Sequence, residues 1–173
     1  MVQKRQVSIN VHLTSGGTME LYDLFKETLE SLSIDNSFIT PDTLSVEISL
    51  EGKQPIIMEK MPDVDLIAFT GILCRYPDRE TLYPLFELLL NVHAYGVATQ
   101  GCFFAANSET SQIIFHSLVT SETMTPEQLA EIARNFSASF TLWHEAYRSG
   151  EIENMLPKNQ DMDVPYTTSM IRA

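Results

Sequence analysis

The stretch VDLIAFTGILCRY, residues 64 to 76, constrains the fold most, because its centre at 66 to 69 is apolar at every position. A strand with one wet face alternates between apolar and polar residues, whereas a strand buried on both faces is a continuous apolar run. We therefore expect this segment to be a central strand of a sheet, with other elements covering it.

Two further strand patterns precede this segment. In TLSVEISLEG, residues 43 to 52, the apolar and polar side chains alternate, which predicts a strand with one wet face. The stretch EGKQP makes a tight connection, and IIMEKM at 56 to 61 follows as the next strand. The apolar face of the first strand consists of Leu44, Val46, Ile48 and Leu50.

Three segments have the period of an amphipathic helix. The first spans about 18 to 33, with Thr18 as its cap. For the second, Asp78 and Thr81 are alternative caps, and Pro84 favours a start near Thr81, because proline is tolerated in a first turn. The third opens at the capping box Thr125 to Gln128. The expected buried stripes are Leu21, Leu24, Phe25, Thr28, Leu29 and Leu32 in the first helix; Leu82, Leu85, Phe86, Leu89, Leu90 and His93 in the second; and Leu129, Ile132, Ala133, Phe136, Phe140 and Trp143 in the third.

The segment GVATQGCFFAANSETSQIIFHSLV, residues 96 to 119, reads as a hairpin whose turn is NSETS. Its first strand is apolar in both phases, so both faces need cover, and we expect it to take part in a two-fold dimer. The residues expected at this dimer interface are Leu85, Leu89, Cys102, Phe103 and Phe104.

The predicted fold is therefore α+β, in the order α-β-β-β-α-β-β-α, with helices packed on a twisted antiparallel sheet. Residues 1–17 form an N-terminal extension in which VSINVHL, residues 7 to 13, has the alternation of a strand. Residues 18–149 form one domain. Residues 150–173 show no sustained period and are expected to be a mobile tail that is dispensable for folding.

Charge and composition exclude several classes of function. The net charge is −12, from 23 acidic and 11 basic residues, so the chain repels nucleic acid and anionic lipid. No segment approaches the roughly 20 apolar residues that cross a bilayer. The two cysteines, Cys74 and Cys102, lie in apolar stretches and suit buried thiols in a reducing compartment, although a bridge between them stays open. We expect a cytosolic protein without membrane insertion.

Reactive motifs are almost absent, which favours binding over catalysis. His144 and Glu145 begin a pattern like HExxH, but Arg148 stands where the second histidine ligand belongs. The loop TSGGT at 14 to 18 lacks the Lys-Ser/Thr ending of a phosphate-binding loop. We expect no catalytic residue, no metal and no cofactor.

The central and C-terminal blocks resemble the class I chaperones of bacterial type III secretion, the Tir-chaperone (CesT-like) family. The resemblance covers about residues 18 to 149, while the extension 1–17 and Ser117 to Val119, where the family often has a proline, depart from it. The matching segments are LFELLLNVHAYG at 85 to 96, GCFFAANSETSQIIFHSLV at 101 to 119, MTPEQLAEIARNF at 124 to 136, and Trp143.

The resemblance implies a homodimer in the bacterial cytoplasm that holds the N-terminal segment of one or more secreted effectors in extended form. The export ATPase is a candidate further partner. The first helix has a stripe wider than one small sheet needs, so we place effector binding there and on the adjacent strands, although these residues also suit a plain core. The expected effector-binding residues are Leu21, Leu24, Phe25, Thr28, Leu32, Leu44, Val46, Ile48 and Ile57.

Two other functions remain compatible with the sequence. One is a small α+β enzyme or small-molecule binding domain with an apolar pocket between the first helix and the sheet. The other is an interaction subunit of a larger complex.

Overall fold

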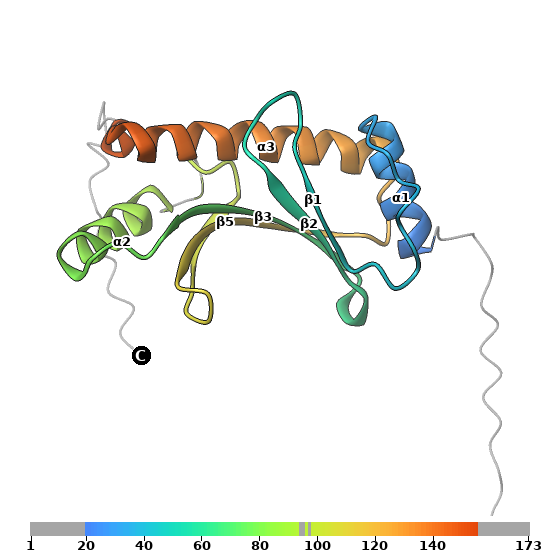
Figure 1. Ribbon diagram of the computed structural model, residues 1–173, viewed down its shortest axis with the longest axis horizontal. Helices are drawn as coiled ribbons and strands as arrows, with labels where there is room; N and C mark the ends of the chain where they lie inside the picture. Colours follow the sequence, from blue (N-terminus) through green and yellow to red (C-terminus); the bar gives the residue numbers. More distant parts are fainter. Residues whose placement is uncertain (1–19, 94–95, 97, 156–173) are drawn as a thin grey trace, which may run out of the picture.

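The computed structural model describes residues 20–93, 96 and 98–155, and the fold below is the fold of these residues (Figure 1). Three helices and five strands occur in the order predicted from the sequence. They are α1 (Leu21–Ser31), β1 (Ser45–Ile48), β2 (Ile56–Met61), β3 (Leu66–Arg75), α2 (Arg79–His93), β4 (Phe103–Asn107), β5 (Gln112–Thr120) and α3 (Pro126–Ser149).

The five strands form one antiparallel sheet in the order β1-β2-β3-β5-β4. The predicted central position of β3 is confirmed, because β3 pairs with β2 on one side and with β5 on the other. Ile67 and Phe69 are fully buried on one face of β3, and Ala68 is buried on the opposite face. The apolar run thus marks a strand with a neighbouring strand on each side, whereas Ile72, on the same face as Ala68, is exposed.

The helix α3 lies across one face of the sheet, with α1 beside its N-terminal end and α2 near its C-terminal end (Figure 1). Aromatic rings fill the layer between α3 and the sheet. Phe136 of α3 lies 5.7 Å from Phe69 and 5.4 Å from Phe115, measured between ring centroids. Trp143 meets Phe104 edge to face at 5.1 Å. This layer is the main core of the domain.

The ends of α3 follow the predicted local chemistry. The Thr125 hydroxyl accepts a hydrogen bond from the backbone N–H of Gln128, and the Gln128 side chain accepts one from the N–H of Thr125. This reciprocal capping box satisfies two amides that the first turn leaves without helical partners. Gly150 ends the helix with φ of 75°, a left-handed conformation that glycine adopts without strain.

Of the two caps predicted for α2, the structure has Asp78, so the helix begins at Arg79 and the favoured start near Thr81 is wrong. The Asp78 carboxylate accepts hydrogen bonds from the backbone N–H groups of Glu80 and Thr81, both at 3.0 Å, and so acts as the cap. Pro84 therefore lies inside the helix, where it removes one backbone hydrogen bond. Leu90, which was expected in the buried stripe, is exposed.

Two other predicted elements are longer than the observed ones. The helix α1 begins after Glu20, and Thr18 lies outside the described residues. The strand β1 ends at Ile48, before a turn in which Glu51 and Gly52 have positive φ and Lys53 donates a backbone hydrogen bond to Leu50. The strand pattern at 7 to 13 also lies outside the described residues.

The residues just after Gly150 contribute to the core, although the sequence predicted a mobile tail from residue 150. Residues Ile152–Met155 form a short 3-10 helix that packs on α3, and Ile152 is buried. A lone apolar residue after a helix has no period to reveal it, which is why the sequence did not predict this contact. Residues 156–173 lie outside the described residues.

We predict that Gly71→Ala lowers the free energy of unfolding by about 1–3 kcal/mol. A Cβ on Gly71 would lie 2.5 Å from Cγ of the Phe140 ring, which is buried in this layer. Urea denaturation measures the loss. In Phe140→Ala the ring is gone, so adding Gly71→Ala to that variant should cost little more; a cost equal to that in the unmodified protein would contradict the steric explanation.

Candidate functional site

The sheet has two edges, and both are free within the described residues. β1 forms one edge and β4 forms the other. A free edge presents backbone N–H and C=O groups that can pair with another extended chain. The side chains around each edge therefore indicate which kind of partner that edge accepts.

At the β1 edge, the backbone groups of Ser45 and Glu47 point away from β2. The N–H of Lys60 donates to the carbonyl of Leu44, which makes these two residues a hydrogen-bonded pair of the antiparallel ladder. Hydrogen-bonded residues alternate along such a strand, so Ser45 and Glu47 direct their N–H and C=O groups outward. These groups are available to an added strand.

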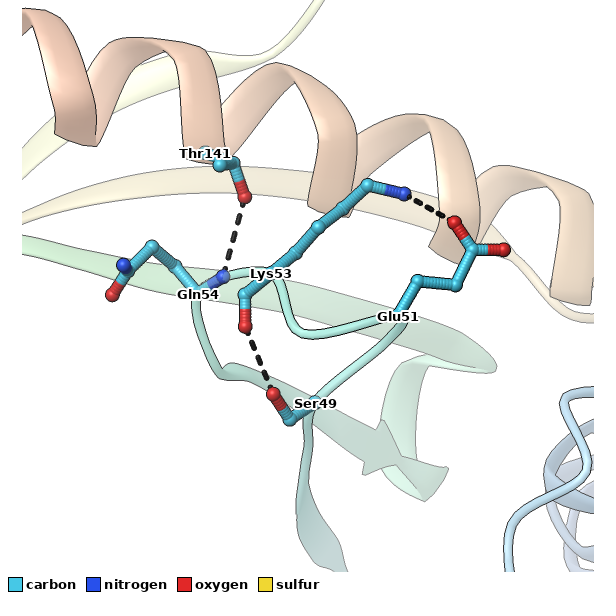
Figure 2. Close-up of polar contacts among 5 residues, drawn as sticks. All are labelled: Ser49, Glu51, Lys53, Gln54 and Thr141. Atoms are coloured by element: carbon cyan, nitrogen blue, oxygen red, sulfur yellow. Dashed lines mark hydrogen bonds and ion pairs between the residues drawn. The ribbon is translucent and has the colours of Figure 1, made fainter.

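The far end of β1 is anchored to α3 by the turn that leads into β2, as Figure 2 shows. The backbone N–H of Gln54 donates to the Thr141 hydroxyl of α3 at 3.3 Å, and the Ser49 hydroxyl donates to the carbonyl of Lys53 at 2.9 Å. Lys53 also forms an ion pair with Glu51 at 2.9 Å. These contacts hold the edge strand in place.

The near end of β1 is held against α1 by a buried lysine. The Lys60 ammonium lies 5.7 Å from the ring centroid of Tyr22 and 5.4 Å from that of Phe25, and it donates to the carbonyl of Pro41 at 3.1 Å. Burial lowers the pKa of Lys60, and the negative charge of Asp42 partly opposes this effect. The start of α1, the loop before β1 and β2 therefore meet at one point.

Apolar side chains remain exposed beside this edge. Leu44 is 53% exposed and lies opposite Lys60, so its side chain is on the same face of the sheet as α1. Phe38, in the loop before β1, is 54% exposed, and Val46 is half-buried. We call Leu44 and Val46, with the outward backbone of Ser45 and Glu47, the β1 surface.

The predicted effector-binding residues divide between core and surface. Leu24, Phe25, Thr28 and Ile48 are buried in the described monomer, and the Thr28 hydroxyl donates to the carbonyl of Leu24. They support the fold and offer no side chain to a partner. Half-buried or exposed are Leu21, Leu32, Val46, Ile57 and Leu44. Sequence reasoning missed Phe38, because a single phenylalanine in a loop has no period.

The space between α1 and the sheet is filled by side chains of the core. Phe25 and Leu29 of α1 and Met58 of β2 are all fully buried. The apolar pocket that the small-molecule alternative places there is therefore occupied by the protein itself.

The β4 edge borders an apolar cavity of about 220 Å³ between this strand and α2. Phe86, Leu90 and His93 line it from α2, and Phe104 and Ala105 line it from β4. Leu90 is 71% exposed, so the mouth of the cavity carries a large apolar side chain in contact with solvent. We call this region the α2–β4 pocket.

The predicted dimer residues lie around this pocket at different depths. Leu85, Leu89 and Cys102 are buried, whereas Phe103 and Phe104 are half-buried. The ring of Phe104 faces the core layer, and the ring of Phe103 lies between His93 and His116. Two exposed residues of α2 were not predicted as part of this surface: Leu90, which was expected to be buried, and Tyr83.

The face of the sheet opposite α3 carries a polar pair among apolar residues. The Thr70 hydroxyl and Nδ1 of His116 are 2.8 Å apart. Burial lowers the pKa of His116, and the charge of Glu59 partly opposes the shift, so the neutral imidazole is favoured. Ile72 and Leu118 are exposed on this face.

Groups suited to catalysis do not converge in the described part of the chain. No cluster of three or more metal-ligating side chains occurs among residues 20–93, 96 and 98–155. Cys74 and Cys102 are free, and burial raises the pKa of both thiols, which makes them weak nucleophiles. Among the described helices, none is both long and apolar enough to span a bilayer.

The comparisons with known proteins identify the fold. No family model and no curated protein matches the sequence. A chain of the HopA1–SchA chaperone–effector complex matches with a TM-score of 0.53 and 12% identity, covering 73% of this chain and 91% of that chain. A chain of the ExsC–ExsE complex matches with a TM-score of 0.57 and 10% identity, covering 73% and 96%.

A third match comes from the heterodimeric ExoU–SpcU complex of the type III secretion system of Pseudomonas aeruginosa. It has a TM-score of 0.53 and 11% identity, and the match covers 76% of this chain and 96% of that chain. The described domain therefore has the α+β fold of the class I type III secretion chaperones, as the resemblance in the sequence implied. Sequence identities of 10–12% support a shared fold but assign no role to individual residues.

A matched pair of leucines tests the division between core and β1 surface. Leu24 is 1% exposed and Leu44 is 53% exposed. We predict that Leu24→Ala lowers the free energy of unfolding by about 2–5 kcal/mol, because it leaves a cavity in the core. Leu44→Ala should change it by within about 0.5 kcal/mol. Chemical denaturation measures both, and equal losses would show that Leu44 is a core residue.

Proposed function

We propose that this protein is a cytoplasmic chaperone of bacterial type III secretion that binds an extended N-terminal segment of one or more secreted effectors. The β1 surface, on a fold shared with chains of chaperone–effector complexes, carries the proposal. The protein acts by binding and not as an enzyme.

The proposed binding mode uses both parts of the β1 surface. The outward backbone groups of Ser45 and Glu47 pair with the backbone of the effector segment, as in strand addition to a sheet edge. Leu44 and Val46 cover apolar side chains that recur at every second position of that segment. A segment bound in this way stays extended, and the export apparatus, with its ATPase, receives it unfolded.

We further propose that the functional unit is a homodimer joined through the α2–β4 pocket. Tyr83 and Leu90 are 69% and 71% exposed on α2, and the pocket beside Leu90 is apolar. A two-fold interface brings the same patch of both subunits together, so the Leu90 side chain of one subunit is placed to cover the pocket of the other. The dimer then carries two β1 surfaces.

The dimer is tested by Leu90→Asp, which places a charge at the mouth of the α2–β4 pocket. We predict a monomer by light scattering at micromolar concentration, with thermal unfolding as cooperative as in the unmodified protein. Leu142→Asp on α3 is the matched control, since Leu142 is 58% exposed and distant in sequence from the pocket. A monomeric unmodified protein, or a dimeric Leu90→Asp variant, would contradict the proposed interface.

Effector binding is tested by Leu44→Asp in the native host, followed by purification of the tagged protein and identification of what accompanies it. The unmodified protein and the Leu142→Asp control should carry a secreted effector. The Leu44→Asp variant should lose at least roughly 90% of it, because a charge now faces an apolar segment. Unchanged recovery would place the effector elsewhere, and a metabolite in place of an effector would reject the function.

A further inference from the structure

The β1 surface is built to accept an added strand, and the chain itself contains an unassigned candidate. Among the described residues, β1 has a neighbour only on the β2 side. Its outward backbone groups at Ser45 and Glu47 and the exposed Leu44 just before it thus face solvent within the described domain. Exposed edges of this kind are normally covered or blunted in natural proteins.

The candidate is VSINVHL, residues 7 to 13, which lies outside the described residues. Val7, Ile9, Val11 and Leu13 share one face of an extended chain. Ser8, Asn10 and His12 occupy the other face. A strand with this pattern covers an apolar surface on one side and meets water on the other, which is what the β1 surface requires.

The connection between candidate and edge is short and has a favourable direction. The chain enters α1 at Leu21, and Tyr22 contacts Lys60, which pairs with Leu44 at the start of β1. Residues 14 to 20 contain Gly16 and Gly17 and can span roughly 23 Å when extended. Residue 13 can therefore reach the Leu44 end of β1, and the preceding residues then run antiparallel to β1.

We propose that residues 7–13 add to the free edge of β1 as an antiparallel strand of the same chain and occupy the β1 surface until an effector segment displaces them. The displacement rests on the function proposed above, whereas the pairing does not. The extension thereby keeps the apolar edge covered between rounds of effector binding, and it weakens the binding of any segment that pairs less well than itself.

The test is hydrogen exchange measured by NMR on the full-length chain without effector. In the unmodified protein, the amides of Ser45 and Glu47 should be protected, because the added strand accepts from them. Ile9→Asp places a charge on the apolar face and should accelerate exchange at these two amides roughly tenfold or more. Ser8→Asp is the matched control, because it places the same charge on the polar face without facing Glu47, and it should leave both rates unchanged.

Each outcome decides the question. Exchange at Ser45 and Glu47 as fast as in an unstructured peptide, in the unmodified chain, would overturn the pairing. Equal acceleration in Ile9→Asp and Ser8→Asp would also overturn it, since the face that carries the charge would not matter. Protection that rises with protein concentration would assign the added strand to a second copy and overturn the proposal for one chain.

A labelled peptide of residues 6–14 separates this proposal from the proposed function. Fluorescence anisotropy should show that the peptide binds the Ile9→Asp variant at least roughly tenfold more tightly than the unmodified chain, whose edge is already occupied. Equal affinity for both proteins would reject occupation by the extension. If effector is still recovered equally from both proteins, the proposed function stands although this inference fails.

Discussion

The packing of α3 on one face of the sheet is the contact on which the rest of the structure depends. It requires a glycine at position 71, because the Phe140 ring occupies the volume that a side chain there would fill. A single long helix covers one face, and among the described residues no helix lies across the opposite face or either edge of the sheet. The surfaces available for binding follow directly from this arrangement.

The two edges differ in chemistry, and this difference separates their proposed roles. The β1 edge combines outward backbone groups with scattered apolar side chains and acidic residues, which suits an extended and variable partner. The β4 edge adjoins a defined apolar cavity beside α2, which suits a surface of fixed shape such as a second copy. One sheet can therefore hold a constant partner at one end and a changing partner at the other.

The sequence predicted the order of the elements because each carries its own local signal. The central position that the apolar run predicts for β3 is confirmed by the structure, as is the capping box at Thr125. Burial was harder to predict, because an apolar stripe does not say whether its partner is in the same chain. Leu24 is core and Leu90 is exposed although both recur at helical spacing. Only the position of α1 and α2 against other elements decides this.

The order of the strands has a consequence for synthesis of the chain. The longest ladder joins β3 to β5, with Leu66 opposite Thr120, and the whole of α2 and β4 lies between them in sequence. Pairing over such a separation is slow and cannot begin until the ribosome has released β5. Until then β3 emerges with an unpaired apolar edge that is prone to aggregate. A protein proposed to hold extended effector segments thus itself exposes an unpaired strand edge while it is being synthesised.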